Sequence, residues 1–141
     1  MFQGNTTLTL DAKGRFAIPA LHREALARTG EEELTITAHP EGYLLLYPRS
    51  VWQRVQEKLM SSTIQDAQRL KRILNGNARD DRADSAGRLL IAPELRKLAR
   101  LEKKIVMAGM GNHFELWDEA AWERQNNYSL GVPPGFEELL Q

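Results

Sequence analysis

Apolar and polar residues alternate in several short stretches of the chain, which is the pattern of β-strands. In "LTLDAKGRFAIP", Leu8 and Leu10 alternate before a polar turn that contains glycine, and Phe16 and Ile18 alternate after it. The segments "ELTITAHPEGYLLLY" and "KKIVMAGMGNHFELW" each contain two runs rich in β-branched and aromatic residues around a tight turn. These patterns predict pairs of strands joined by short turns, and therefore a β-rich fold.

Helical patterns follow or separate these strand pairs. Pro19 and Pro93 each precede a short run with apolar residues at helical spacing, and a proline in the first turn leaves no helix hydrogen bond unmade. Between the strand-rich segments, "SVWQRVQEKL" and "SSTIQDAQRLKRILNG" each place their apolar residues on one side. Ser62 and Gln65 have the spacing of a capping box, so we expect the second of these helices to begin there and to end at Gly76.

One five-residue motif occurs twice in the chain. "DAKGR" begins at Asp11, and "DSAGR" begins at Asp84 with Asp, Gly and Arg at the same offsets. Asp84 lies 73 positions after Asp11, whereas later in the copies Trp117 lies only 70 positions after its counterpart Tyr47. The second copy is therefore three residues shorter between these points. A half of about 70 residues is near the lower limit for an independent core, so we expect each copy to need the other.

The Asp, Gly and Arg of the motif each have a chemistry that suits a particular role in a loop. The Asp stands at the end of a strand, where its carboxylate can accept backbone N–H groups and fix the loop. The Gly permits a backbone angle that other residues resist, and the Arg presents a planar head of five donors suited to phosphate or to a guanine edge. An internal Asp–Arg pair that braces the turn is the alternative, and both roles can hold together. These residues are Asp11, Gly14 and Arg15 in the first copy, and Asp84, Gly87 and Arg88 in the second.

The charge of the chain is zero in total but unevenly distributed. The net charge is +2 over residues 1–30, −4 over 31–48, +7 over 49–104 and −5 over 105–141. A molecule divided in this way can present a positive face to a polyanion while its other face stays acidic. A plain coat of Lys and Arg on solvated helices would give the same counts.

Little in the sequence supports enzyme chemistry. The chain has no cysteine, and His22, His39 and His113 have no second ligand at a useful spacing, so we expect no metal site. "AGMGNHF" lacks the third glycine of a dinucleotide loop. There is neither a signal-like start nor an apolar run of roughly 18 residues. We therefore predict a cytoplasmic protein that is not an enzyme and has no cofactor, small-molecule ligand or membrane partner.

Several motifs in order give the chain a specific resemblance. Together with the repeated D-x-x-x-R, the opening "MFxG", "LLLYP", "GRLLIAP" and "FELWDE" resemble the MraZ family of the AbrB-like superfamily. The resemblance implies a β-rich α+β fold in which two tandem βαββα repeats form a double-split β-barrel, with connecting helices. It also implies ring-shaped homo-oligomers, associated with the nucleoid, that bind double-stranded DNA at short direct repeats ahead of the division and cell-wall gene cluster, including their own promoter.

The family's DNA-facing loops match residues of both copies. In the first copy these are Asp11, Lys13, Gly14 and Arg15, and in the second they are Asp84, Gly87 and Arg88. Ala86 stands in the second copy where the first has Lys13, so the two loops need not contact DNA equally. A ring would present many such loops to one duplex, and avidity would then supply affinity that one loop lacks.

These observations divide the chain and define its predicted function. The predicted parts are a first repeat at 5–51, connecting helices at 52–77, a second repeat at 78–124 and a flexible tail at 125–141. The function we predict is a sequence-specific transcriptional regulator, a repressor. Two alternatives remain, an oligomeric scaffold that binds another protein through its acidic carboxy-terminal region, and an antitoxin-type DNA-binding protein.

Overall fold

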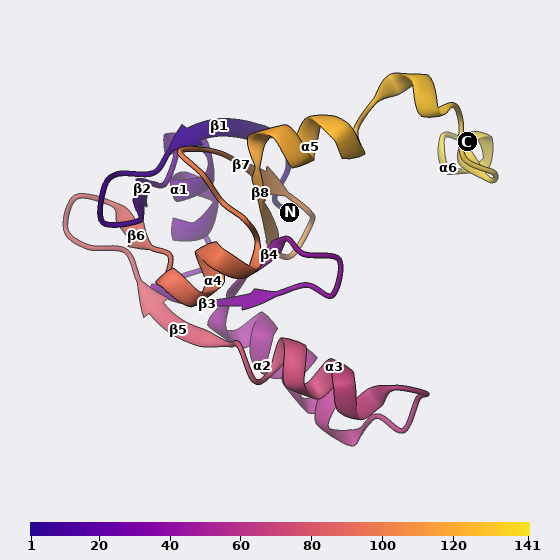
Figure 1. The fold of residues 1–141 in the computed structure, drawn as a ribbon, viewed down its shortest axis with the longest axis horizontal. Helices are drawn as coiled ribbons and strands as arrows, with labels where there is room; N and C mark the ends of the chain where they lie inside the picture. Colours follow the sequence, from indigo (N-terminus) through magenta and orange to yellow (C-terminus); the bar gives the residue numbers. More distant parts are fainter.

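The computed structural model describes residues 1–141 as an α+β protein (Figure 1). The strands are β1 (Asn5–Thr9), β2 (Arg15–Ala17), β3 (Glu33–Ala38), β4 (Leu44–Pro48), β5 (Arg79–Arg82), β6 (Arg88–Leu90), β7 (Lys104–Gly109) and β8 (Phe114–Asp118). The helices are α1 (Ala20–Ala27), α2 (Arg49–Ser61), α3 (Ala67–Leu74), α4 (Pro93–Leu98), α5 (Glu119–Gln125), the short 3₁₀ helix η1 (Tyr128–Leu130) and α6 (Phe136–Leu139). The expected α+β class is confirmed, with a mostly antiparallel sheet.

Six strands form one antiparallel sheet in the order β1-β7-β8-β4-β3-β5, and β2 pairs with β6 in a separate antiparallel ribbon. The order is symmetrical, because β1, β7 and β8 in one half of the sheet mirror β5, β3 and β4 in the other. The edge strands β1 and β5 do not pair, so the sheet is not closed by a continuous set of strand pairs. The amino-terminal strands β1 and β2 pair only with strands from the second half of the chain.

The main core lies between the sheet and the helices α1 and α4. It is a cluster of 18 buried apolar residues drawn from both halves of the chain. On β3 and β4 the inward positions are Leu34, Ile36, Leu44 and Leu46, all at most 3 % exposed. These inward positions alternate along each strand, as expected for a β-strand, although the residues between them are also buried.

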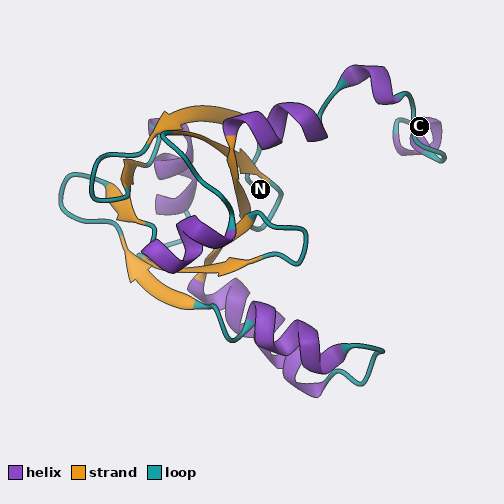
Figure 2. Ribbon diagram, in the orientation of Figure 1, coloured by secondary structure: helices purple, strands orange, loops and turns teal.

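A hairpin of α2 and α3 covers the outer face of β3 and β4, where a second, smaller cluster forms. This cluster contains Tyr43, Leu45, Tyr47 and Trp52, and Leu74 packs against it. With helices on one side and the main core on the other, β4 is buried along its whole length. The hairpin projects from the body of the molecule, as the ribbon view shows (Figure 2).

The start of α3 differs from the sequence prediction. The capping-box spacing predicted a helix from Ser62, but α2 extends to Ser61 and α3 begins at Ala67. The Ser62 hydroxyl accepts a long hydrogen bond from the N–H of Ile64, at 3.3 Å, and Asp66 has a left-handed backbone at φ 62°. These residues form the turn of the hairpin, because the chain must reverse direction there to lay α3 back against α2.

The carboxy-terminal segment leaves the body after α5 (Figure 1). Tyr128, Leu130 and Leu139 are each more than 70 % exposed, and η1 and α6 contain no buried residue. The helices α5 and α6 are short, and no helix of the structure has the length and apolarity needed to cross a membrane.

Candidate functional site

The two copies of the repeated motif lie beside each other at one end of the molecule. One forms the loop between β1 and β2, and the other forms the loop between β5 and β6 (Figure 1). The pairing of β2 with β6 holds them together. The carbonyl of Gly14 accepts the N–H of Ile91 at 2.9 Å, and the carbonyl of Gly87 accepts the N–H of Ile18 at 3.0 Å. Each loop is therefore fastened to the strand that follows the other loop.

Asp11 braces the first loop from inside. One carboxylate oxygen accepts the backbone N–H groups of Lys13 and Arg15, both at 2.9 Å. The other oxygen accepts the Nε–H of Arg15 at 2.8 Å. These bonds, above all that from the Arg15 backbone, lower the pKa of Asp11 to about 2, because they favour the charged carboxylate.

Asp84 braces the second loop in the same manner. Its carboxylate accepts the N–H groups of Ala86 and Arg88 at 2.9 Å and the Nε–H of Arg88 at 3.0 Å. The backbone bond from Arg88 is again the main reason that the pKa of Asp84 is lowered. The prediction that each Asp accepts backbone N–H groups to fix its loop is confirmed in both copies, and so is the internal Asp–Arg pair.

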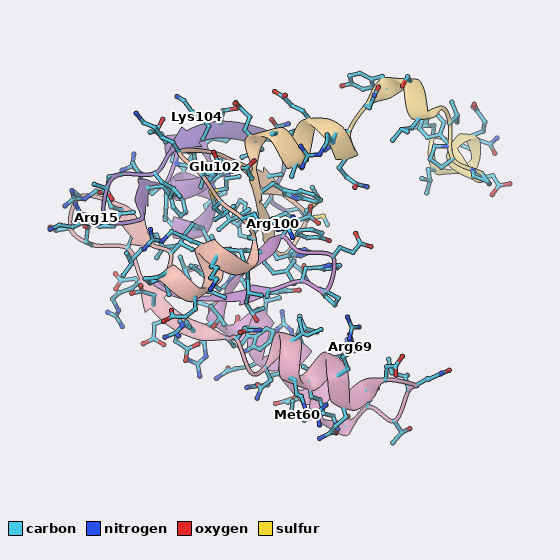
Figure 3. The ribbon with its side chains drawn as sticks, viewed as in Figure 1. Arg15, Met60, Arg69, Arg100, Glu102 and Lys104 are labelled. Atoms are coloured by element: carbon cyan, nitrogen blue, oxygen red, sulfur yellow. The ribbon has the colours of Figure 1, made fainter.

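The brace uses only part of each arginine. The Nε–H of Arg15 donates to Asp11 and that of Arg88 donates to Asp84. The two terminal nitrogens of each arginine make no hydrogen bond to the protein. The Arg15 side chain is 27 % exposed and that of Arg88 is 41 % exposed. Figure 3 places Arg15 at the loop end of the molecule, far from Arg69 on the helical hairpin. The two roles foreseen for the arginine are thus compatible, because the brace leaves donors free for a ligand.

The glycines of the motif are needed for backbone geometry and for space. Gly14 has φ +85° and Gly87 has φ +76°, which is the left-handed region that side chains disfavour. A Cβ at Gly14 would lie 2.5 Å from Cζ of Arg96, and a Cβ at Gly87 would lie 2.8 Å from a terminal nitrogen of Arg23. Each loop thus rests against an arginine.

These two arginines are not among the site residues predicted from the sequence. Arg96 belongs to α4 in the second copy and packs on the first loop, whereas Arg23 belongs to α1 in the first copy and packs on the second loop. Neither side chain takes part in an ion pair. The signal was present, since Arg23 and Arg96 are separated by the same number of residues as Arg15 and Arg88. The exchange of strands between the copies, which the sequence pattern does not reveal, brings each arginine to the opposite loop.

The two loops carry different charge. The first holds the exposed Lys13 and the second has Ala86 at the same place. With Arg96 included, the first loop has three cations against the single carboxylate of Asp11. The second loop has two cations, Arg88 and the packed Arg23, and one carboxylate, Asp84, so the first loop is the more positive of the two.

The histidines lie elsewhere and serve in packing. His22 is 1 % exposed and meets Phe114 edge to face, and burial lowers its pKa. His39 stacks on Tyr43 and His113 stacks on Tyr47. No group of three or more His, Asp or Glu side chains is placed to hold a metal ion.

Replacing Asp11 by Ala is expected to lower the melting temperature in a pH-dependent way. The pKa of Asp11 is lower in the folded protein than its ordinary value of 3.8, so the ionised carboxylate stabilises the fold above about pH 4 and this contribution is lost as pH falls toward 2. Melts of the Asp11→Ala variant and wild type should differ at pH 6 and converge near pH 2.

The matched control for this prediction is Glu123→Ala, since Glu123 is an exposed carboxylate on α5 with no hydrogen bond. Its melting temperature should follow that of wild type at both pH values. A gap between Asp11→Ala and wild type that stayed constant down to pH 2 would show that the carboxylate charge does not brace the loop.

Comparison with known proteins assigns the chain to one family. The family described as "MraZ protein, putative antitoxin-like" matches residues 1–73 and 75–132. A protein of Dechloromonas aromatica named "Transcriptional regulator MraZ" is 49 % identical over 147 aligned positions, covering 99 % of each chain. Proteins with the same name from Cupriavidus pinatubonensis and Burkholderia cenocepacia are 48 % and 47 % identical, each covering 94 % of both chains. The chain belongs to the MraZ family.

Proposed function

We propose that the protein is a DNA-binding transcriptional regulator rather than an enzyme, and that the paired loops are its DNA-contacting surface. The proposed contact residues are Asp11, Lys13, Gly14, Arg15, Asp84, Gly87 and Arg88, with each Asp acting through the loop that it holds. Three near full-length relatives carry the name of a transcriptional regulator, which supports the proposed role.

One observation carries the proposal. Arg15 and Arg88 lie diagonally across the same short β2–β6 ribbon, because Arg15 pairs with Leu90 and Arg88 with Ala17. Each arginine head is oriented by a carboxylate, and each has its terminal donors free. A guanidinium held in this way loses little entropy on binding, and its planar pair of donors fits a phosphate or the O6 and N7 atoms of guanine. An isolated surface arginine would not be oriented in advance.

The finer features follow from the family. We propose that the two repeats make a double-split β-barrel, that copies assemble into a ring, and that the ring binds short direct repeats ahead of the division and cell-wall genes and the protein's own gene. In this arrangement the regulator acts as a repressor, located at the nucleoid. The direct repeats would meet loops on neighbouring subunits, so many weak contacts would add.

The decisive experiment is a binding assay on DNA from upstream of the protein's own gene. A scrambled duplex of the same length and composition is the control. The regulator should bind the upstream DNA markedly more tightly than the scrambled DNA at the same salt concentration, because direct contacts to bases add to the contacts with phosphates. Equal affinity for the two duplexes would overturn sequence-specific recognition.

We expect this affinity to fall steeply with salt. Each phosphate contact in duplex DNA contributes about −0.9 to the slope of log affinity against log salt concentration. Since several loops act together, the slope measured in the binding assay should correspond to several contacts. An affinity that does not change with salt would exclude the loops as phosphate contacts and favour a protein-binding scaffold, whose exposed surface would be the apolar and acidic carboxy-terminal segment.

A further inference from the structure

Arg23 and Arg96 pack against the paired loops, yet neither takes part in the hydrogen bonds by which Asp11 and Asp84 brace them. Arg96 packs against Gly14, the residue before Arg15 in the first loop. Arg23 packs against Gly87, the residue before Arg88 in the second loop. The carboxylate of each loop forms an ion pair with the loop arginine, whereas Arg96 and Arg23 take part in no ion pair. Each loop thus holds a second guanidinium without an ionic partner.

An unpaired guanidinium next to another cation is unfavourable in the free protein, because like charges repel. The arrangement becomes favourable when an anion binds both, and guanidinium groups bind phosphate oxygens through paired, charge-assisted hydrogen bonds. The second arginine therefore has the chemistry of a ligand contact.

The first loop holds its second arginine more firmly. The Nε–H of Arg96 donates to the carbonyl of Ile91 at 3.0 Å, and the N–H of Ile91 donates to the carbonyl of Gly14 at 2.9 Å. One residue therefore fixes both the loop and the arginine beneath it. The Arg23 side chain makes no hydrogen bond within the protein and is exposed.

We propose that Arg96 and Arg23 are further DNA contacts, each binding a backbone phosphate beside the loop of the opposite repeat. The proposal rests on the proposed function of the loops. Each DNA-contacting surface is then composite, since its loop comes from one repeat and its helix arginine from the other. Neither repeat alone carries a complete surface, and the preorganised Arg96 makes the stronger contact.

The test measures operator and scrambled-DNA affinity over a range of salt for wild type, Arg96→Ala, Arg23→Ala and Arg96→Lys. The matched control is Arg69→Ala, which removes the same charge from the helical hairpin, far from the loops (Figure 3). Melting temperature and oligomer size are recorded for every variant.

Arg96→Ala should weaken binding by about tenfold or more, to operator and scrambled DNA alike, because a phosphate contact carries no sequence information. Its salt slope should become shallower by about 1 for each engaged subunit. Arg23→Ala should show the same changes to a smaller degree. Arg96→Lys should keep most of the slope because it keeps the charge, and Arg69→Ala should match wild type.

The outcomes separate this proposal from the function on which it rests. Equal, salt-independent binding of both duplexes by wild type would overturn the proposed function itself. Specific binding by wild type with an unchanged slope in Arg96→Ala would overturn the role of Arg96 as a contact, and a lower melting temperature with that unchanged slope would make it a structural residue. Should Arg96→Ala fail to fold, the slope of Arg23→Ala decides, because that side chain makes no hydrogen bond within the protein.

Discussion

The Arg15→Ala variant is expected to lose nearly all operator binding while keeping its fold and its oligomeric size. The terminal nitrogens of Arg15 make no hydrogen bond within the protein, and the substitution removes only the bond from Nε–H to Asp11. The backbone N–H groups of Lys13 and Arg15 still donate to Asp11, so the loop keeps most of its brace. One direct contact to DNA contributes roughly 1–3 kcal/mol, and the substitution recurs in every subunit that touches the duplex. The loss therefore multiplies in the ring that we propose.

Arg88→Ala is the matched comparison, because it removes the equivalent arginine from the second loop. Its effect should be milder, since Ala86 replaces the lysine of the first loop and the second loop carries less positive charge. Operator binding, thermal melts and size measurements on both variants check the prediction. Normal DNA binding by Arg15→Ala, or its disassembly before binding can be measured, would make Arg15 a structural brace only.

The sequence predicted the loops well because their geometry is local. The bonds that Asp11 accepts from the N–H groups of Lys13 and Arg15 span two and four residues, so the motif contains the groups that brace the loop from inside. The same applies to β3, β4, β7 and β8, because their runs of β-branched and aromatic residues predicted buried strands around tight turns.

Features that depend on distant partners could not be predicted in the same way. The strand β5 has the sequence "RDDR", with no apolar residue to alternate, and it forms because it pairs with β3. Its Asp80 accepts hydrogen bonds from Thr35 and from Arg49, which lie on other elements. The positions of Arg23 and Arg96 likewise depend on which strands pair across the two repeats.

Because β1 and β2 pair with strands from the second half of the chain, an isolated first half is expected to lack most of its strand partners. A fragment of residues 1–49 contains β1 to β4, yet β1 pairs only with β7 and β2 only with β6. Of the native strand pairs it retains only the hairpin of β3 and β4, and an isolated hairpin is at best marginally stable in water.

We expect the 1–49 fragment to be unfolded as a monomer, because its core side chains would be left exposed to water. In the whole protein, Phe16, Leu34, Ile36 and Leu44 are at most 3 % exposed, and burying a side chain of this size contributes about 1.5–3 kcal/mol. Circular dichroism and amide NMR signals measure the outcome, with the full-length chain as the control. Because β2 and β6 are equivalent, two fragments could pair at high concentration, and any structure should then depend on concentration. Dispersed amide signals with a cooperative melt independent of concentration would show that one repeat folds alone, which would contradict the fused arrangement on which the composite loops depend.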